Sequence, residues 1–213
     1  SKQWARHPRE LPASIIKRVP IRLTFDDNYF NDRYQGIPIG GYTSIFEKML
    51  DGIPVELNTD FHLDRETFLS KFDHVIFTGP IDSFFDYSLG HLEYRSLRFD
   101  HQLINCSDFQ GNAVINHTEA QIPYTRTYEH KHFDMNFSAD RSTVTYEYPD
   151  KWEPGKIEIY PVNTDENQTL FSKYQDMTKE FPNVTFGGRL GQYRYFDMHQ
   201  VIGASLEKVK SLA

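Results

Sequence analysis

Cysteine, long apolar runs and basic residues are all scarce in this sequence. The single cysteine, Cys106, excludes an internal disulfide framework and fits a reducing compartment, so we expect a cytoplasmic protein. No apolar run reaches the length of a transmembrane helix, and nothing at the N-terminus reads as a signal peptide. Acids outnumber lysine and arginine by 30 to 23, and the formal net charge of -7 disfavours nucleic acid or an anionic membrane as a general partner.

The signatures of several enzyme classes are also missing. The sequence contains no G-x-G-x-x-G dinucleotide fingerprint, P-loop, G-x-S-x-G elbow or H-E-x-x-H motif. His130 and His132 would face the same side of a strand and could form half of a metal site, but no third ligand has a suitable spacing. Alternating polar residues on a solvated strand explain this pattern better, so we predict no bound metal.

What the sequence does contain is enough apolar material for a folded core, with 38% apolar and 15% aromatic residues. Helical stripes and short apolar strands between residues 40 and 80 indicate part of an α/β nucleotide-binding domain. The predicted elements there are a helix with a capping box at Ser44 to Glu47, a strand at 53–57, a helix at 65–72 and a buried parallel strand at 74–77.

The pattern changes to period-two, β-branched sequence between residues 92 and 162, which predicts an antiparallel sheet. Its predicted strands include 114–115, 143–148 and 157–160. A helix around 170–181, a strand ending at Phe186 and an amphipathic closing helix follow. We therefore predict an α+β fold: part of an α/β domain, an antiparallel β-sheet domain and flanking helices.

The stretch from Phe186 to Met198 combines glycines, arginines and aromatic residues just before the closing helix, whose expected N-cap is Asp197. Backbone N–H groups, arginine forks and glycines without a Cβ suit a phosphate-bearing ligand. Further arginines lie beside tyrosines or at predicted element ends; the whole set is Arg18, Arg95, Arg126, Arg189 and Arg194. For any one of these residues, core packing or a surface ion pair is an alternative to phosphate binding. Taken together, the five arginines with their neighbouring tyrosines favour a diphosphate site.

Several stretches resemble the UDP-galactopyranose mutases. They are Lys-Gln-Trp (2–4), Glu-Leu-Pro-Ala-x-Ile-Ile-Lys-Arg (10–18), Asn-Tyr-Phe-x-Asp-Arg-Tyr-Gln-Gly-Ile-Pro (28–38), Thr-Gly-Pro-Ile-Asp-x-x-Phe-Asp-Tyr (78–87), Leu-Glu-Tyr-Arg-Ser-Leu (92–97), Gln-Gly-Asn-Ala-Val-Ile-Asn (110–116), Pro-Tyr-Thr-Arg (123–126), Glu-His-Lys-His-Phe (129–133) and Gly-Gly-Arg-Leu-x-x-Tyr-x-Tyr-x-Asp-Met (187–198). The resemblance covers essentially the whole chain. The sequence lacks the family's N-terminal flavin-binding part, with its glycine fingerprint, and most of the helical substrate domain. We therefore expect a C-terminal fragment.

The resemblance implies a non-redox isomerase that uses reduced FAD to interconvert UDP-galactopyranose and UDP-galactofuranose, for cell wall polysaccharide biosynthesis. In that family flavin N5 attacks the anomeric carbon, UDP leaves, and the flavin-sugar adduct opens and recloses as the other ring size. The fragment alone would be inactive because its FAD site is incomplete. A homodimer is possible, and the other hypotheses are a cofactor-free UDP-sugar or nucleotide-binding module and a purely structural fragment.

The resemblance also implies roles for individual residues and boundaries for the domains. The catalytic residues, which would grip the diphosphate, are Arg18 and Arg126. The substrate-binding residues would be Trp4, Tyr29, Asn116, Tyr160, Tyr195 and Asp197, and the flavin side would hold Arg95, Gly188 and Arg189. The expected domains are 1–35, the end of the helical substrate domain; 36–88, part of the FAD-binding domain; 89–165, the sheet domain; and 166–213, a helix-strand-helix that returns to the FAD domain.

Overall fold

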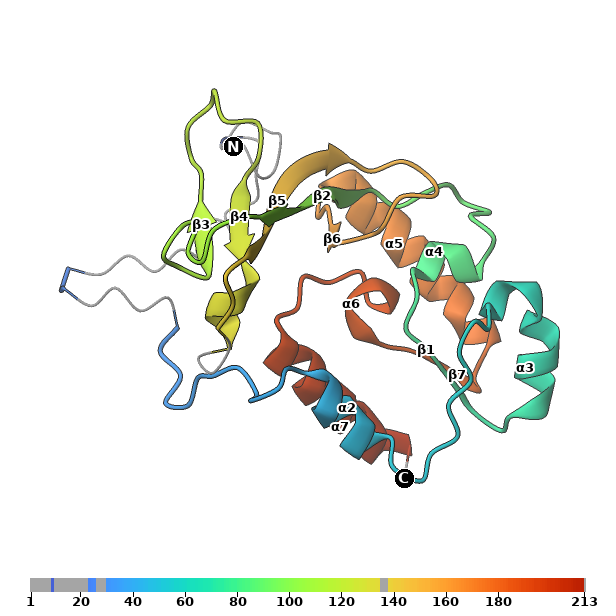
Figure 1. Ribbon diagram of the computed structural model, residues 1–213. Coiled ribbons are helices and arrows are strands. Elements are labelled where there is room, and N and C mark those ends of the chain that lie inside the picture. Colours follow the sequence, from blue (N-terminus) through green and yellow to red (C-terminus); the bar gives the residue numbers. More distant parts are fainter. Residues whose placement is uncertain (1–8, 10–22, 26–29, 135–137, 213) are drawn as a thin grey trace. The chain divides into compact units, whose positions relative to one another are not determined.

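The computed structural model describes residues 9, 23–25, 30–134 and 138–212 (Figure 1). The chain divides into two compact units, each built from two separate stretches. The first unit contains Ser1–Leu57 and Leu97–Pro149, and the second contains Asn58–Ser96 and Asp150–Ala213. Among the described residues, no helix is long and apolar enough to cross a membrane.

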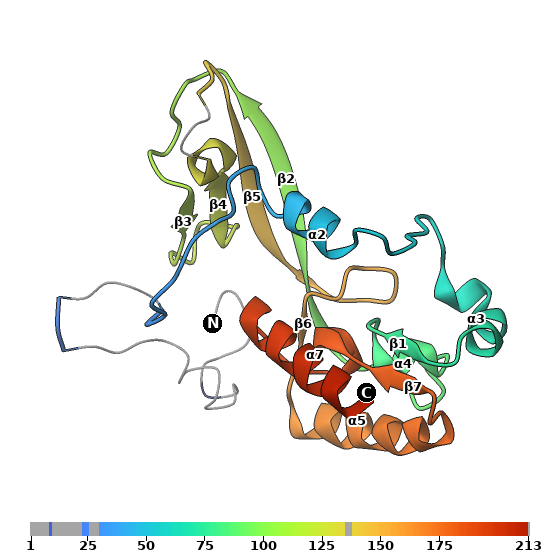
Figure 2. The same ribbon diagram turned by 90° about the horizontal axis from the view of Figure 1, so that it is seen from below.

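The first unit is dominated by antiparallel sheet, as the period-two sequence predicts (Figure 2). Its strands lie in the order β3-β4-β5-β2, with β4 antiparallel to both β3 and β5. The elements of this unit are α2 (Thr43–Met49), β2 (Tyr94–Ile104), β3 (Val114–Asn116), β4 (Arg126–Glu129), a 3-10 helix (His130–Phe133) and β5 (Ser142–Lys151), of which β2 begins and β5 ends in the second unit. Cross-strand partners share a face of the sheet, so the pairing of Asn116 with Arg126 and of Arg126 with Glu147 aligns three polar side chains.

The second unit combines helices with a short parallel sheet. Strands β1 and β7 pair in parallel, and the start of β2 pairs with β6. The elements are 3-10 helices at Phe61–Leu63 and Thr178–Glu180, α3 (Arg65–Lys71), β1 (Val75–Phe77), α4 (Ile81–Phe84), β6 (Tyr160–Pro161), α5 (Asp165–Met177), β7 (Val184–Phe186), α6 (Gly188–Gly191) and α7 (Met198–Leu212).

Aromatic rings form the core of the second unit. Phe84 is 1% exposed, and its ring lies 5.2 Å from Phe77, 5.1 Å from Phe85 and 4.8 Å from Phe186, measured between centroids. These edge-on contacts join both parallel strands to α4. Aromatic rings contribute more buried apolar area than any other side chain, so they stabilise this junction strongly. The core therefore fixes the carboxyl ends of β1 and β7, where the glycine-rich segment begins.

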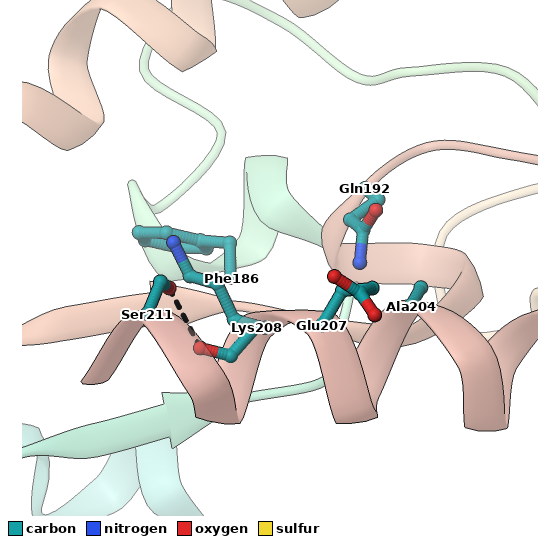
Figure 3. A pocket seen from close by; sticks show the side chains of 6 residues that line it. All are labelled: Phe186, Gln192, Ala204, Glu207, Lys208 and Ser211. Atoms are coloured by element: carbon teal, nitrogen blue, oxygen red, sulfur yellow. Dashed lines mark hydrogen bonds between the residues drawn. The ribbon is translucent and has the colours of Figure 1, made fainter. Parts of the chain in front are cut away.

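Helix α7 carries the predicted apolar stripe, but most of the stripe is exposed. Val201 is half-buried, whereas the other four residues of the stripe are 45% to 60% exposed: Ile202, Leu206, Val209 and Leu212. Toward Phe186 and Gln192 the helix presents small and polar side chains instead, across an open groove of about 390 Å³ lined by Ala204, Glu207, Lys208 and Ser211 (Figure 3). The apolar face of α7 is thus not buried within its own unit.

Three local predictions are wrong. Helix α2 begins at Thr43, so Ser44 lies inside it instead of capping it, and the Ser44 hydroxyl donates to the carbonyl of Gly41 at 3.4 Å. Residues 53–57 form no strand and are exposed, because no neighbouring strand among the described residues offers them hydrogen bonds. The strand predicted at 157–160 is limited to Tyr160–Pro161. The strand predicted at 74–77 does pair in parallel, but Ile76 is 57% exposed.

Replacing Gly191 by alanine should destabilise the second unit. A Cβ at Gly191 would lie 3.1 Å from the carbonyl oxygen of Phe77 and 3.4 Å from the carbonyl carbon of Phe186, and neither backbone atom can move easily. Overpacking of this kind costs about 1–3 kcal/mol. Chemical denaturation measures the loss in the free energy of unfolding. Gly203→Ala in α7 is the control, because a Cβ at Gly203 would meet nothing within 4 Å. The control should gain up to about 1 kcal/mol of helix stability; equal stability of the two variants would contradict the packing.

Candidate functional site

The predicted site residues fall into two clusters, one in each unit. Asn116 and Arg126 lie in the first unit, and the second unit holds Arg95, Tyr160, Gly188, Arg189, Tyr195 and Asp197. The predictions for Trp4, Arg18 and Tyr29 lie outside the described residues.

Arg126 is the centre of the first cluster. Its Nε donates to Asn116 Oδ1 at 2.9 Å, and its NH1 lies 3.4 Å from the Tyr128 hydroxyl. The same NH1 lies 3.5 Å from Glu147 Oε2, and the Arg126 side chain is 30% exposed whereas that of Glu147 is 3% exposed. The sheet register explains this arrangement, since Asn116, Arg126 and Glu147 form one cross-strand row and Tyr128 follows two residues later on the same face. A cation held at the surface by a buried carboxylate can receive a phosphate ligand.

Glu147 and Tyr128 complete the cluster, and sequence reasoning missed both. Thr125 Oγ1 donates to Glu147 Oε1 at 2.7 Å, and the Tyr128 hydroxyl makes a short hydrogen bond to Glu147 Oε2. Burial raises the pKa of Tyr128 to about 12; the bond from Arg126 lowers it and that to Glu147 raises it. Tyr128 therefore keeps its proton at neutral pH and donates a hydrogen bond to Glu147. The available signal was an acid inside the apolar and aromatic strand 143–148.

The second cluster forms around Arg189. Its NH1 donates to the carbonyl of Ile159 at 3.1 Å, and its NH2 donates to the carbonyl of Phe196. The guanidinium carbon lies 5.5 Å from the ring centroid of Tyr160 and 5.0 Å from that of Tyr195. The two tyrosine rings are stacked, with centroids 5.0 Å apart and 22° between planes. Arg189 thus fixes the positions of both predicted substrate tyrosines by cation-π contact.

The glycine-rich turn directly precedes Arg189 in the chain. Gly188 has a φ of 72°, a conformation that favours glycine, and a Cβ there would lie 3.6 Å from Thr78 Cβ. Arg95 pairs with Tyr160 in the β2–β6 ladder. Asp197 directly precedes α7 as predicted: its carbonyl accepts from Val201 N–H at 3.0 Å, and Gln200 Oε1 accepts from Asp197 N–H at 2.8 Å. Crevices at the carboxyl ends of parallel strands are the usual ligand sites of α/β folds.

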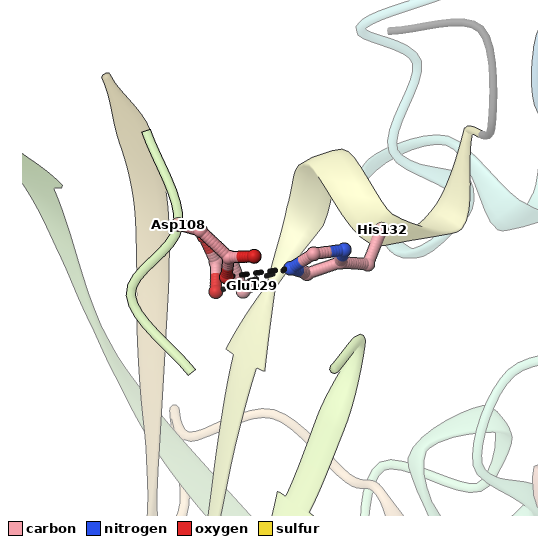
Figure 4. A group of neighbouring side chains, drawn as sticks. All are labelled: Asp108, Glu129 and His132. Carbon is pink, nitrogen blue, oxygen red and sulfur yellow. Dashed lines mark hydrogen bonds and ion pairs between the residues drawn. The ribbon is translucent and has the colours of Figure 1, made fainter. Parts of the chain in front are cut away.

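His130 and His132 do not share a strand face, which corrects the sequence prediction. Strand β4 ends at Glu129, and the following 3-10 helix turns the two side chains apart. His130 Nε2 lies 2.7 Å from Thr145 Oγ1, whereas His132 Nε2 lies 3.3 Å from both Asp108 Oδ1 and Glu129 Oε2 (Figure 4).

The group of Asp108, Glu129 and His132 has ligand atoms within 4.8 Å of one another, as a metal site would. Glu129, however, is already saturated with donors. It accepts from Phe109 N–H at 3.0 Å, Gln110 N–H at 2.7 Å and the Ser142 hydroxyl, and Lys131 Nζ lies 3.4 Å away. These donors satisfy the hydrogen-bonding capacity of the buried Glu129 carboxylate without a metal ion. We interpret the group as an ion-pair cluster that anchors residues 108–111 to the end of β4.

Comparisons with known proteins show which family the sequence matches. The family model described as UDP-galactopyranose mutase matches residues 1–195. A probable UDP-galactopyranose mutase of Klebsiella pneumoniae is 41% identical over 208 residues, which cover 97% of this chain and 53% of the relative. A dTDP-fucopyranose mutase of Escherichia coli is 37% identical over 211 residues, which cover 97% of this chain and 56% of the relative. The chain thus spans about half the length of the curated relatives it matches.

The fold has a solved counterpart. A crystal structure of reduced UDP-galactopyranose mutase is similar with a TM-score of 0.52 and 14% identity, over 67% of this chain and 42% of that chain. At this identity the similarity concerns the fold alone, and it confirms the predicted α+β class.

Proposed function

The chain belongs to the UDP-galactopyranose mutase family, and we propose that the whole protein interconverts UDP-galactopyranose and UDP-galactofuranose with reduced FAD. The observation that carries the proposal is the surface arginine Arg126, held by Asn116, Tyr128 and the buried Glu147. An arginine oriented in this way suits a diphosphate better than a lysine would, because its planar fork matches phosphate oxygens.

We propose that Arg126 binds the diphosphate of the nucleotide sugar. Negative charge develops on the β-phosphate as UDP leaves the anomeric carbon, so a fixed cation contributes most at that moment. Asn116 supports this role, because its side-chain oxygen accepts from Arg126 Nε and fixes the plane of the guanidinium.

In the second unit we propose that the hydroxyls of Tyr160 and Tyr195 bind the substrate, with Arg189 holding their rings in place. Asp197, two residues after Tyr195 and directly before α7, is proposed to orient these tyrosines. The substrate roles of Trp4, Arg18 and Tyr29 stay predictions.

Reduced FAD, when bound, would supply the nucleophile. The residues that we propose on the flavin side are Arg95, Gly188 and Arg189. The turn fits a large planar cofactor, because Gly188 adopts a positive φ and adds no Cβ at the carboxyl ends of β1 and β7. We also propose that these two strands are part of a larger parallel sheet of a flavin-binding domain, since parallel sheets are usually covered on both faces and Ile76 is 57% exposed.

A second candidate substrate comes from the relatives. The E. coli relative at 37% identity is a dTDP-fucopyranose mutase. The nucleotide sugar in its name differs from UDP-galactopyranose in both the nucleotide base and the sugar. A diphosphate clamp built on Arg126 serves either substrate, because both nucleotide sugars carry the same diphosphate group. The remaining alternative is a nucleotide-sugar-binding module without flavin.

The test is turnover of both nucleotide sugars by the flavin-loaded gene product that contains this chain. We expect conversion of UDP-galactofuranose to UDP-galactopyranose, at a higher kcat/KM than conversion of dTDP-fucofuranose. A preference for the dTDP-sugar would move the assignment to the second candidate. UDP binding without any turnover, despite bound and reduced flavin, would favour the binding module.

A further inference from the structure

We propose that Tyr128 is a positioning residue that keeps Arg126 available to the diphosphate by occupying the Glu147 carboxylate. The inference rests on the proposed role of Arg126. Nothing in the sequence distinguishes Tyr128 from the other tyrosines of the sheet; its role follows from the place of its hydroxyl.

The Tyr128 hydroxyl lies between the two charges. It donates a short hydrogen bond to Glu147 Oε2, and its oxygen lies 3.4 Å from Arg126 NH1. The other carboxylate oxygen, Oε1, accepts from Thr125 Oγ1 at 2.7 Å. Both oxygens of Glu147 therefore have neutral donors, and Arg126 NH1 stands 3.5 Å from the carboxylate, beyond the usual length of a charge-assisted hydrogen bond.

This arrangement matters because Glu147 is 2% exposed and needs donors. A buried carboxylate that loses a donor takes the nearest remaining one. Without the Tyr128 hydroxyl that donor is Arg126, which would close onto Oε2 as a direct ion pair. An arginine drawn into the sheet by a carboxylate offers less of its fork and less of its charge to a phosphate.

Tyr128 stays protonated throughout the pH range of enzyme assays, because its pKa is raised to about 12, first by burial. Its role is therefore to donate a fixed hydrogen bond and to keep the ion pair apart. It neither transfers a proton nor needs to contact the sugar.

The main experiment compares Tyr128→Phe with Tyr146→Phe. Tyr146 pairs with Thr127, so its side chain lies on the opposite face of the same sheet, where its ring centroid is 5.0 Å from that of Tyr124. Each variant removes one hydroxyl and keeps the ring, and both should melt close to the wild-type temperature. We expect Tyr128→Phe to lower kcat about tenfold with KM changed less than about threefold, because the diphosphate charge grows as UDP leaves. Tyr146→Phe should leave both parameters unchanged.

A second pair of variants separates positioning from direct contact. In a Glu147→Gln background the carboxylate charge is gone, so loss of the Tyr128 hydroxyl can no longer draw Arg126 inward. Tyr128→Phe should then lower kcat less than about threefold, a non-additive result that a merely structural role does not give. The same tenfold loss in both backgrounds would overturn the inference, and so would a wild-type kcat for Tyr128→Phe alone.

UDP affinity keeps this inference distinct from the proposed mutase activity. If the wild-type protein binds UDP but turns over neither nucleotide sugar, the proposed function fails, and the inference is decided by calorimetry of UDP binding to the same flavin-loaded gene product and its variants. Tyr128→Phe should then weaken UDP binding several-fold and Tyr146→Phe should not; equal affinities would overturn it. A wild-type protein that neither binds UDP nor turns over would overturn both.

Discussion

Arg126→Ala should lower kcat by about 10²–10³-fold, the typical effect of removing one fixed donor to a developing negative charge. The fold should change little, because Glu147 keeps its hydrogen bonds from Thr125 and Tyr128 after the guanidinium is gone. Steady-state kinetics of the flavin-loaded gene product with UDP-galactofuranose measures the loss. Thermal melting of the same samples shows whether the loss comes from chemistry or from unfolding.

Arg98→Ala is the matched control for this experiment. Arg98 lies in the same sheet, and its guanidinium carbon sits 4.0 Å from the ring centroid of Tyr148. Tyr148 follows Glu147 in β5, so this pair lies on the face opposite to Arg126. Removing the same charge there should leave kcat within about twofold of wild type, because exposed charges act weakly through screened solvent. Equal losses in both variants would mean that net charge matters and not the position of Arg126.

The second large effect concerns stability in acid. Burial alone would raise the pKa of Glu129, but hydrogen bonds from Ser142, Phe109 and Gln110, together with Lys131, outweigh it and hold the pKa at about 2, below the ordinary value of 4.5. A depressed pKa stabilises the fold above the unfolded value and loses that contribution as pH falls through the folded value. Between pH 7 and pH 3 the wild-type protein should therefore lose about 2 kcal/mol that Glu129→Gln does not lose.

Urea denaturation at pH 7, 5 and 3 measures this difference. At pH 7 the Glu129→Gln variant should be less stable than wild type, and the gap should narrow toward pH 3. Glu153→Gln, at an exposed carboxylate, is the control and should follow the wild-type curve. A gap between wild type and Glu129→Gln that stays constant with pH would contradict the assigned pKa.

The sequence was sufficient for the types of element around the site but not for their pairing. The alternation in 143–148 predicted a strand, and this strand is part of β5. Arg126 was identified as a candidate because Tyr124 lies two residues before it. Glu147 was not identified because its partnership with Arg126 depends on strand register across 21 residues of chain, and a slip of one residue would turn Glu147 to the other face. Tyr128 was missed for the same reason.

Helix α7 and the segment 53–57 show a different limit. An apolar stripe predicts that a helix has a face to bury, but periodicity does not say what covers that face, and here Ile202 is 57% exposed. A short apolar run such as 53–57 has no preference strong enough to form a strand without a partner strand. In both places the sequence contains the apolar residues that the prediction relied on. Whether those residues are buried in α7, or form a strand at 53–57, depends on which elements the fold places next to them.

We propose that Arg126 and its supporting residues serve a flavin-dependent nucleotide-sugar mutase. The most direct measurement is conversion of UDP-galactofuranose to UDP-galactopyranose by the flavin-loaded, chemically reduced gene product, in parallel with its Arg126→Ala variant. We predict turnover that depends on the reduced flavin and falls by about two orders of magnitude or more in the variant. Full turnover in Arg126→Ala, or no turnover by a wild-type protein with bound reduced flavin, would contradict it.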